Sequence, residues 1–77
     1  MQNNHHMAKF SGDKPEDYRL WRKTARAYLK ARKVDDDAKG STILTLLEGA
    51  ALKMCEHIVD DALEQPGGED LVFAIFD

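Results

Sequence analysis

Few residues in this chain have the types and spacing that catalysis requires. Acid–base and nucleophilic chemistry both need polar side chains that converge in a pocket, such as a nucleophile beside a base. His57 lies among acidic residues on the polar side of a predicted helix, and Ser11 and Ser41 lack the context of a nucleophile elbow. The sequence therefore predicts no catalytic residue and no enzymatic activity.

Metal and cofactor sites are equally poorly represented. The three consecutive acids at 35–37 lack the alternate spacing of a calcium loop and are better read as a solvated helix N-terminus. Cys55 is the single cysteine, so it has no second thiol at ligand spacing and is expected to pack as a small hydrophobic residue. The glycine pair at 67–68 lacks the lysine and preceding strand of a nucleotide-binding loop. We expect no metal and no cofactor.

The charges divide the chain into two halves of opposite sign. Residues 9–33 contain nine Lys or Arg against three acids, a net of +6, and residues 34–77 contain two lysines against eleven acids, a net of −9. Such an asymmetry favours pairing within the chain or head-to-tail contact between copies.

The basic half predicts one long helix over residues 15–33, which contain no internal glycine or proline after Pro15. Asp13 and Glu16 have the spacing of a capping box at its start. Three faces follow from the helical period. The core-facing stripe is Tyr18, Trp21, Ala25, Tyr28 and Leu29; the basic strip is Arg19, Arg22, Lys23, Arg26, Lys30 and Lys33; the smaller third face, which could meet a neighbour, is Leu20, Ala27 and Ala31.

The basic strip has three interpretations that stay open from the sequence. It can be an ordinary solvated helix face, a contact for the acidic half of the same or another copy, or a surface for the phosphates of a nucleic acid. The last is the least favoured, because the total charge is −3 and the aromatic residues fall on the opposite arc.

Three further helices are predicted over residues 36–47, 50–63 and 69–77, separated by Gly49 and by the breaker at 66–68. Gly40 weakens the first of these predictions, since glycine is unfavourable in a helix interior. The helix over residues 50–63 is expected to bury Met54, Cys55, Ile58 and Val59 on one continuous apolar side. The fold class is therefore all-α, a compact bundle of about four helices. Its expected core anchors are Phe10, Tyr18, Trp21, Tyr28, Leu29, Leu47 and Ile58.

The chain is long enough for one domain only. Residues 1–8 are polar and without period, as expected of a disordered leader or a tag remnant, and residues 9–77 form the helical lobe. The lobe stops on an apolar run, which suggests truncation from something longer. The sequence has neither a signal peptide nor an apolar run of membrane-spanning length, so an intracellular, cytoplasmic location without membrane contact is expected.

Several short motifs resemble the Gag-like capsid region of long-terminal-repeat retrotransposons. They are the Phe-x-Gly stretch at 9–13, Tyr18 and Trp21 with the Ala-Tyr-Leu at 27–29, and the residues at 37–39 and 46–51 around Gly49. The resemblance spans about residues 9–63. It implies an N-terminal capsid lobe that self-associates into a particle around the RNA of the element, followed by a second lobe.

That resemblance also defines the expected partners. The chain itself comes first, as a homo-oligomer that could depend on the missing second lobe. The alternative is a domesticated Gag-derived adaptor that binds a partner peptide in a hydrophobic groove, with Phe73 and Phe76 contributing apolar surface. RNA is expected to bind only weakly or through regions that the chain lacks.

Overall fold

Helices account for all the regular structure of residues 7–77, the part of the chain that the computed structural model describes. In chain order the elements are η1 (Pro15–Asp17), α1 (Tyr18–Ala31), η2 (Asp36–Ala38), α2 (Lys39–Leu44), α3 (Gly49–Lys53), α4 (Asp60–Leu63) and α5 (Gly68–Phe76), where η denotes a 3-10 helix. The predicted all-α class is confirmed.

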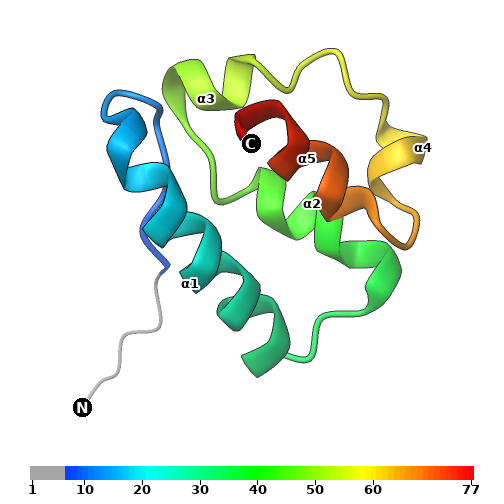
Figure 1. The fold of residues 1–77 in the computed structure, drawn as a ribbon. Coiled ribbons are helices and arrows are strands. Elements are labelled where there is room, and N and C mark those ends of the chain that lie inside the picture. The colour runs from blue at the N-terminus through cyan, green and yellow to red at the C-terminus, as the bar shows by residue number, and fades with distance from the viewer. Residues whose placement is uncertain (1–6) are drawn as a thin grey trace.

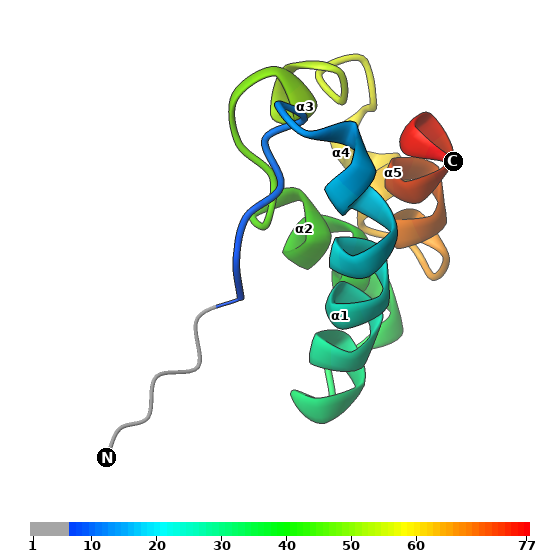
Figure 2. The same ribbon diagram turned by 60° about the vertical axis from the view of Figure 1, so that its left-hand side comes forward.

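The helices are arranged around a central pair. Helix α2 packs most extensively on α5. Figure 1 shows these two in the middle, with α1 on one side and α4 on the other. The turned view in Figure 2 shows the segment before η1 passing beside the chain that joins α2 to α3. There Phe10 and Leu47 form an isolated parallel bridge, in which Phe10 N–H donates to the Leu46 carbonyl and Glu48 N–H to the Phe10 carbonyl, both at 3.0 Å.

Helix α1 buries four of the five residues of the stripe that its period predicts, and Tyr28 is partly buried at its edge. The predicted capping box is wrong, because Pro15 starts the 3-10 turn after Lys14 and so leaves Asp13 one residue too early to cap it. The helix also ends earlier than predicted, at Ala31. The Val34 N–H closes it on the Leu29 carbonyl at 3.1 Å.

Helix α2 is shorter than predicted: residues 45–47 form turns, and the Leu46 carbonyl and the Glu48 N–H bond to Phe10. Gly40, which was expected to weaken this helix, lies against α5 and the end of α4. A Cβ atom built on Gly40 would stand 2.6 Å from the Leu63 carbonyl oxygen and 2.8 Å from the carbonyl carbon of Gly68. No side chain fits at this crossing of α2 and α5. Gly49 takes a left-handed conformation, at φ +56°, and starts α3.

The continuous helix predicted over residues 50–63 is wrong. Helices α3 and α4 are separated by turns. In these turns the Cys55 N–H donates to the Leu52 carbonyl and the Ile58 N–H to the Cys55 carbonyl, each three residues back in the chain. The chain changes direction here so that α4 packs on α2 and α5 and buries Leu63. As a result Met54 and Val59, predicted to be buried, are 51% and 66% exposed.

The core is one cluster with an aromatic centre. Its buried members are Phe10, Tyr18, Trp21, Ala25, Leu29, Ile43, Leu46, Leu47, Ala51, Cys55, Leu63, Val72 and Phe73. The Phe10 ring lies 5.5 Å from both Trp21 and Phe76 and 5.6 Å from Tyr18, centroid to centroid. Such ring pairs contribute about 0.5–1.5 kcal/mol beyond their buried area. Of the predicted leader, residues 1–6 lie outside the described residues, whereas Met7 packs against this core and belongs to the fold.

Candidate interaction surfaces

Helix α1 presents a continuous outer face to solvent. At about 100 degrees per residue, six exposed side chains fall within an arc of about 120 degrees, with the charged members on one half and the apolar members on the other. This outer face consists of Arg19, Leu20, Lys23, Ala27, Lys30 and Ala31. Leu20 is 69% exposed, the highest value among the large apolar residues of the described chain. The third face predicted from the sequence is therefore on the surface.

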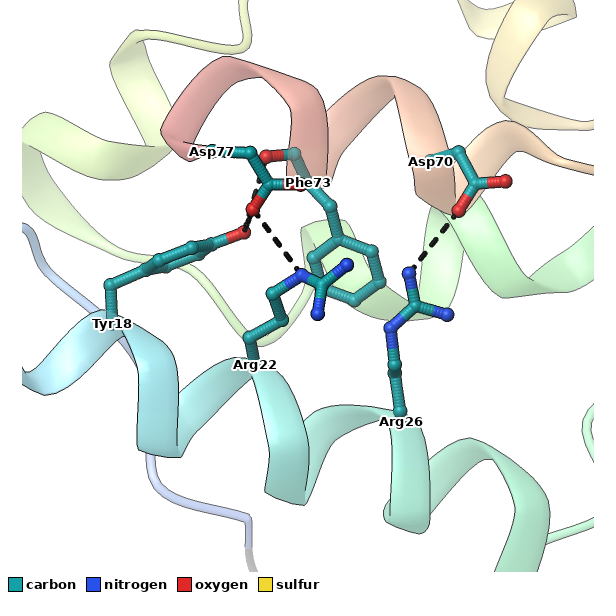
Figure 3. A network of polar contacts seen from close by, with 6 residues as sticks. All are labelled: Tyr18, Arg22, Arg26, Asp70, Phe73 and Asp77. Atoms are coloured by element: carbon teal, nitrogen blue, oxygen red, sulfur yellow. Dashed lines mark hydrogen bonds and ion pairs between the residues drawn. The ribbon is translucent and has the colours of Figure 1, made fainter.

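The inner edge of α1 faces the C-terminal helix through a network of polar contacts (Figure 3). The Tyr18 hydroxyl donates to Asp77 Oδ1 at 2.6 Å, and the Phe73 carbonyl oxygen is a second acceptor at 3.1 Å. Burial raises the pKa of Tyr18 well above its usual value, and the neighbouring Asp77 carboxylate raises that pKa further. The phenol therefore stays neutral and donating throughout the physiological range.

Two arginines of the basic strip close over the same helix. The Arg22 and Arg26 guanidinium groups lie 5.3 Å and 4.7 Å from the centroid of the Phe73 ring. Arg22 Nε is 3.3 Å from Asp77 Oδ1, and one terminal nitrogen of Arg26 is 3.5 Å from Asp70 Oδ1. One of the open interpretations of the basic strip is thus realised in part: two of its six cations contact the acidic half of the same molecule.

A shallow apolar groove runs between α1 and the segment that precedes it. Its volume is about 490 Å3. Its walls are residues 8–14 on one side and Asp17, Leu20, Trp21 and Thr24 on the other. The Trp21 Nε1 atom is buried without a hydrogen-bond acceptor, which costs about 1–3 kcal/mol. The α1 residues carry an apolar signal in the sequence, but the opposite wall is created only by the path of the chain.

The opposite end of the molecule, around α4, is acidic. A hollow of about 360 Å3 lies between α2, α3 and α4, and Leu52, Glu56 and Asp60 are among its lining residues. The acidic end is defined by the exposed Leu52, Glu56, Val59, Asp60, Asp61 and Glu64. Within residues 7–77 none of its four acids makes an ion pair.

The candidate metal-binding side chains do not come together in the described part of the chain. No group of three or more His, Cys, Asp or Glu side chains within residues 7–77 could hold a metal ion. Cys55 is buried, and burial raises the pKa of its thiol, so little reactive thiolate forms at neutral pH. His57 is exposed, and Asp36 pairs with Lys39 at 3.1 Å.

The predicted core anchors separate into two groups. Phe10, Tyr18, Trp21, Leu29 and Leu47 are buried, whereas Tyr28 and Ile58 are partly buried at the edge of the core. Of the two residues expected to offer apolar surface to a partner, Phe73 is buried in the core, and Phe76 is partly buried against it. The stacking of Arg22 and Arg26 on Phe73 is not predicted from the sequence. Its signal was available, since both arginines border the buried stripe of α1 one turn apart.

No helix of residues 7–77 combines the length and the apolar character needed to cross a bilayer. No protein-family model, curated protein or solved structure matches this chain.

Proposed function

We propose that this chain is a non-enzymatic, Gag-like capsid lobe that acts by self-association in a retrotransposon-derived particle. The observation that carries the proposal is the amount of large apolar surface left outside the core of so small a domain. The exposed residues are Leu20, Leu52, Met54, Val59 and Leu71, each at least 40% accessible. Leu20 lies on α1, whereas Leu52, Met54 and Val59 lie on α3 and the segment that follows it, and a partner that covers either surface would bury apolar area.

Two further properties support this function. The all-helical architecture is the one that the resemblance implies for a capsid lobe. A domain of 77 residues buries a modest fraction of its surface, so association would add stability that its own core supplies only sparingly. The particle would assemble in the cytoplasm.

Sedimentation velocity from about 10 μM to about 1 mM, where weak complexes become populated, tests self-association. We expect the weight-average mass to rise with concentration above the 8.7 kDa of the monomer. A strict monomer at the highest concentration contradicts the proposal.

A second candidate function, favoured by the groove beside Leu20 and Trp21, is binding of a partner peptide. An extended apolar peptide would cover the groove and the exposed Leu20 side chain. Selection from a displayed peptide library tests it: we expect enriched peptides to lose binding to Leu20→Glu. The matched control is Leu71→Glu, which changes another exposed leucine, on α5 and outside the groove. Equal loss in both variants, or no enrichment at all, contradicts this candidate.

RNA binding by this lobe is the weakest of the three, because Asp70 and Asp77 already face two of the arginines that would contact phosphates.

A further inference from the structure

Six of the eleven acids in the second half of the chain form two groups with different surroundings. Asp70 and Asp77 belong to the α5 region, face α1, and pair with Arg26 and Arg22. The four acids of the acidic end belong to α4 and the turns on either side of it, and none makes an ion pair within residues 7–77. These acids have no ion pair among the described residues, although Lys53 lines the same hollow as Glu56 and Asp60.

The same division applies to the cations of α1. Arg22 and Arg26 point toward α5, as Figure 3 shows. Arg19, Lys23 and Lys30 lie on the outer face, and none of them has an ion pair among the described residues. Between these cations and the acidic end stand α2 and α5, because α1 and α4 lie on opposite sides of that central pair (Figure 1). The two charge groups cannot neutralise each other within one copy.

Apolar residues accompany the charge on both surfaces. The outer face combines three cations with Leu20, Ala27 and Ala31, and the acidic end combines four acids with Leu52 and Val59. Each surface thus has an apolar part whose burial is favourable. The two surfaces carry charges of opposite sign, which set the orientation of the two copies.

We infer that the outer face of α1 in one copy binds the acidic end of a second copy. This inference rests on the proposed self-association and names the surfaces that carry it. A like-with-like contact would bring cations to cations or acids to acids, which is unfavourable, whereas the unlike pairing is favourable. The contact is therefore heterologous: a pair of copies keeps one unused outer face and one unused acidic end, and the array extends or closes as a ring.

A mixing experiment with two charge-reversed variants of the full chain tests the pairing. Arg19→Glu with Lys23→Glu reverses the outer face, and Glu56→Lys with Glu64→Lys reverses the acidic end. All four side chains are exposed, and Asp60 and Asp61 are retained because acids favour the first turn of α4. We expect each variant alone to associate roughly tenfold or more weakly than the wild type. The two variants mixed should associate again, since the mixture contains both intact surfaces.

The control is Asp35→Lys with Asp37→Lys, which makes the same change in net charge as the acidic-end variant but lies before α2. It should associate as the wild type does. Circular dichroism of each variant checks that the helices are intact.

Each result separates the inference from the function on which it rests. If both reversed variants associate as strongly as the wild type, another surface carries self-association, and the inference is overturned while the proposed function stands. If the variants are weakened but the mixture stays monomeric, the contact is not between these two surfaces. A monomeric wild type overturns both.

Discussion

At the scale of single residues, Gly40 reverses the sign of a common substitution. In an exposed helix, glycine to alanine stabilises by about 1 kcal/mol, because alanine has the higher helix propensity. Here the new Cβ would meet backbone atoms of Leu63 and Gly68 that cannot rotate away. We expect Gly40→Ala to lower the free energy of unfolding by about 1–3 kcal/mol in urea titrations. Ser41→Ala, one position along α2, is the control and should change stability by no more than about 0.5 kcal/mol.

Tyr18 makes stability depend on alkaline pH. Its folded-state pKa is raised by burial and by Asp77, while the pKa of a tyrosine in the unfolded chain is about 10. The stabilisation is therefore fully present below about pH 10 and is lost as the pH rises beyond it. Tyr18→Phe should cost about 1–2 kcal/mol at pH 7, where the hydrogen bond is lost, and should show a shallower decline in stability between about pH 9.5 and 11.5.

Urea midpoints across that alkaline range measure the effect. Tyr28→Phe, which leaves the contact between Tyr18 and Asp77 in place, is the control. Identical pH slopes for the wild type and Tyr18→Phe would show that Tyr18 contributes nothing to the alkaline loss of stability.

At the scale of elements, Arg26 is expected to stabilise the contact between α1 and α5 more by stacking on Phe73 than by its ion pair with Asp70. The pair of Arg26 and Asp70 is exposed and long, at 3.5 Å, so it is expected to contribute little. The guanidinium over the Phe73 ring is worth about 0.5–1 kcal/mol. Arg26→Lys keeps the charge but loses the planar stack, and it should destabilise by about that amount. Asp70→Asn should cost less than about 0.5 kcal/mol, and the opposite ranking in urea titrations would show that the ion pair dominates.

The sequence predicts elements well where the apolar period is long and uninterrupted, as in α1. It fails between α3 and α4, because residues 54–59 keep a helical period while the backbone turns to bring Leu63 into the core. It fails at the end of α2 because the backbone groups of Leu46 and Glu48 bond to Phe10, which is distant in the sequence. Both failures come from long-range packing, which overrides local pattern.

The surfaces show the same limit. Exposure of Leu20 follows from its angular position on α1, so the sequence suffices for half of the groove. The other half depends on the path of the segment before η1, which carries no period of its own, and the exposure of Val59 depends on the turns between α3 and α4.

At the scale of the whole molecule, association links stability to concentration. A species that binds only folded partners stabilises the fold by mass action, by about 1.4 kcal/mol for each tenfold rise in concentration above the dissociation constant. We therefore expect the thermal midpoint of the wild type to rise with protein concentration at low salt. The rise should shrink near 1 M salt, where charges are screened beyond about 3 Å. A variant with Arg19→Glu and Lys23→Glu should show a midpoint that is flat with concentration, as calorimetry can report.

The crossing of α2 over α5 also has an evolutionary meaning. Gly40 and Gly68 come from distant parts of the chain, yet a side chain at either would overlap the same Leu63 carbonyl. Neither position can drift alone while the crossing persists, whereas the charges of the outer face can be exchanged without disturbing the core. In lineages that keep this fold, the two glycines should outlast most of the surface, and their spacing offers a signature by which divergent relatives could be recognised.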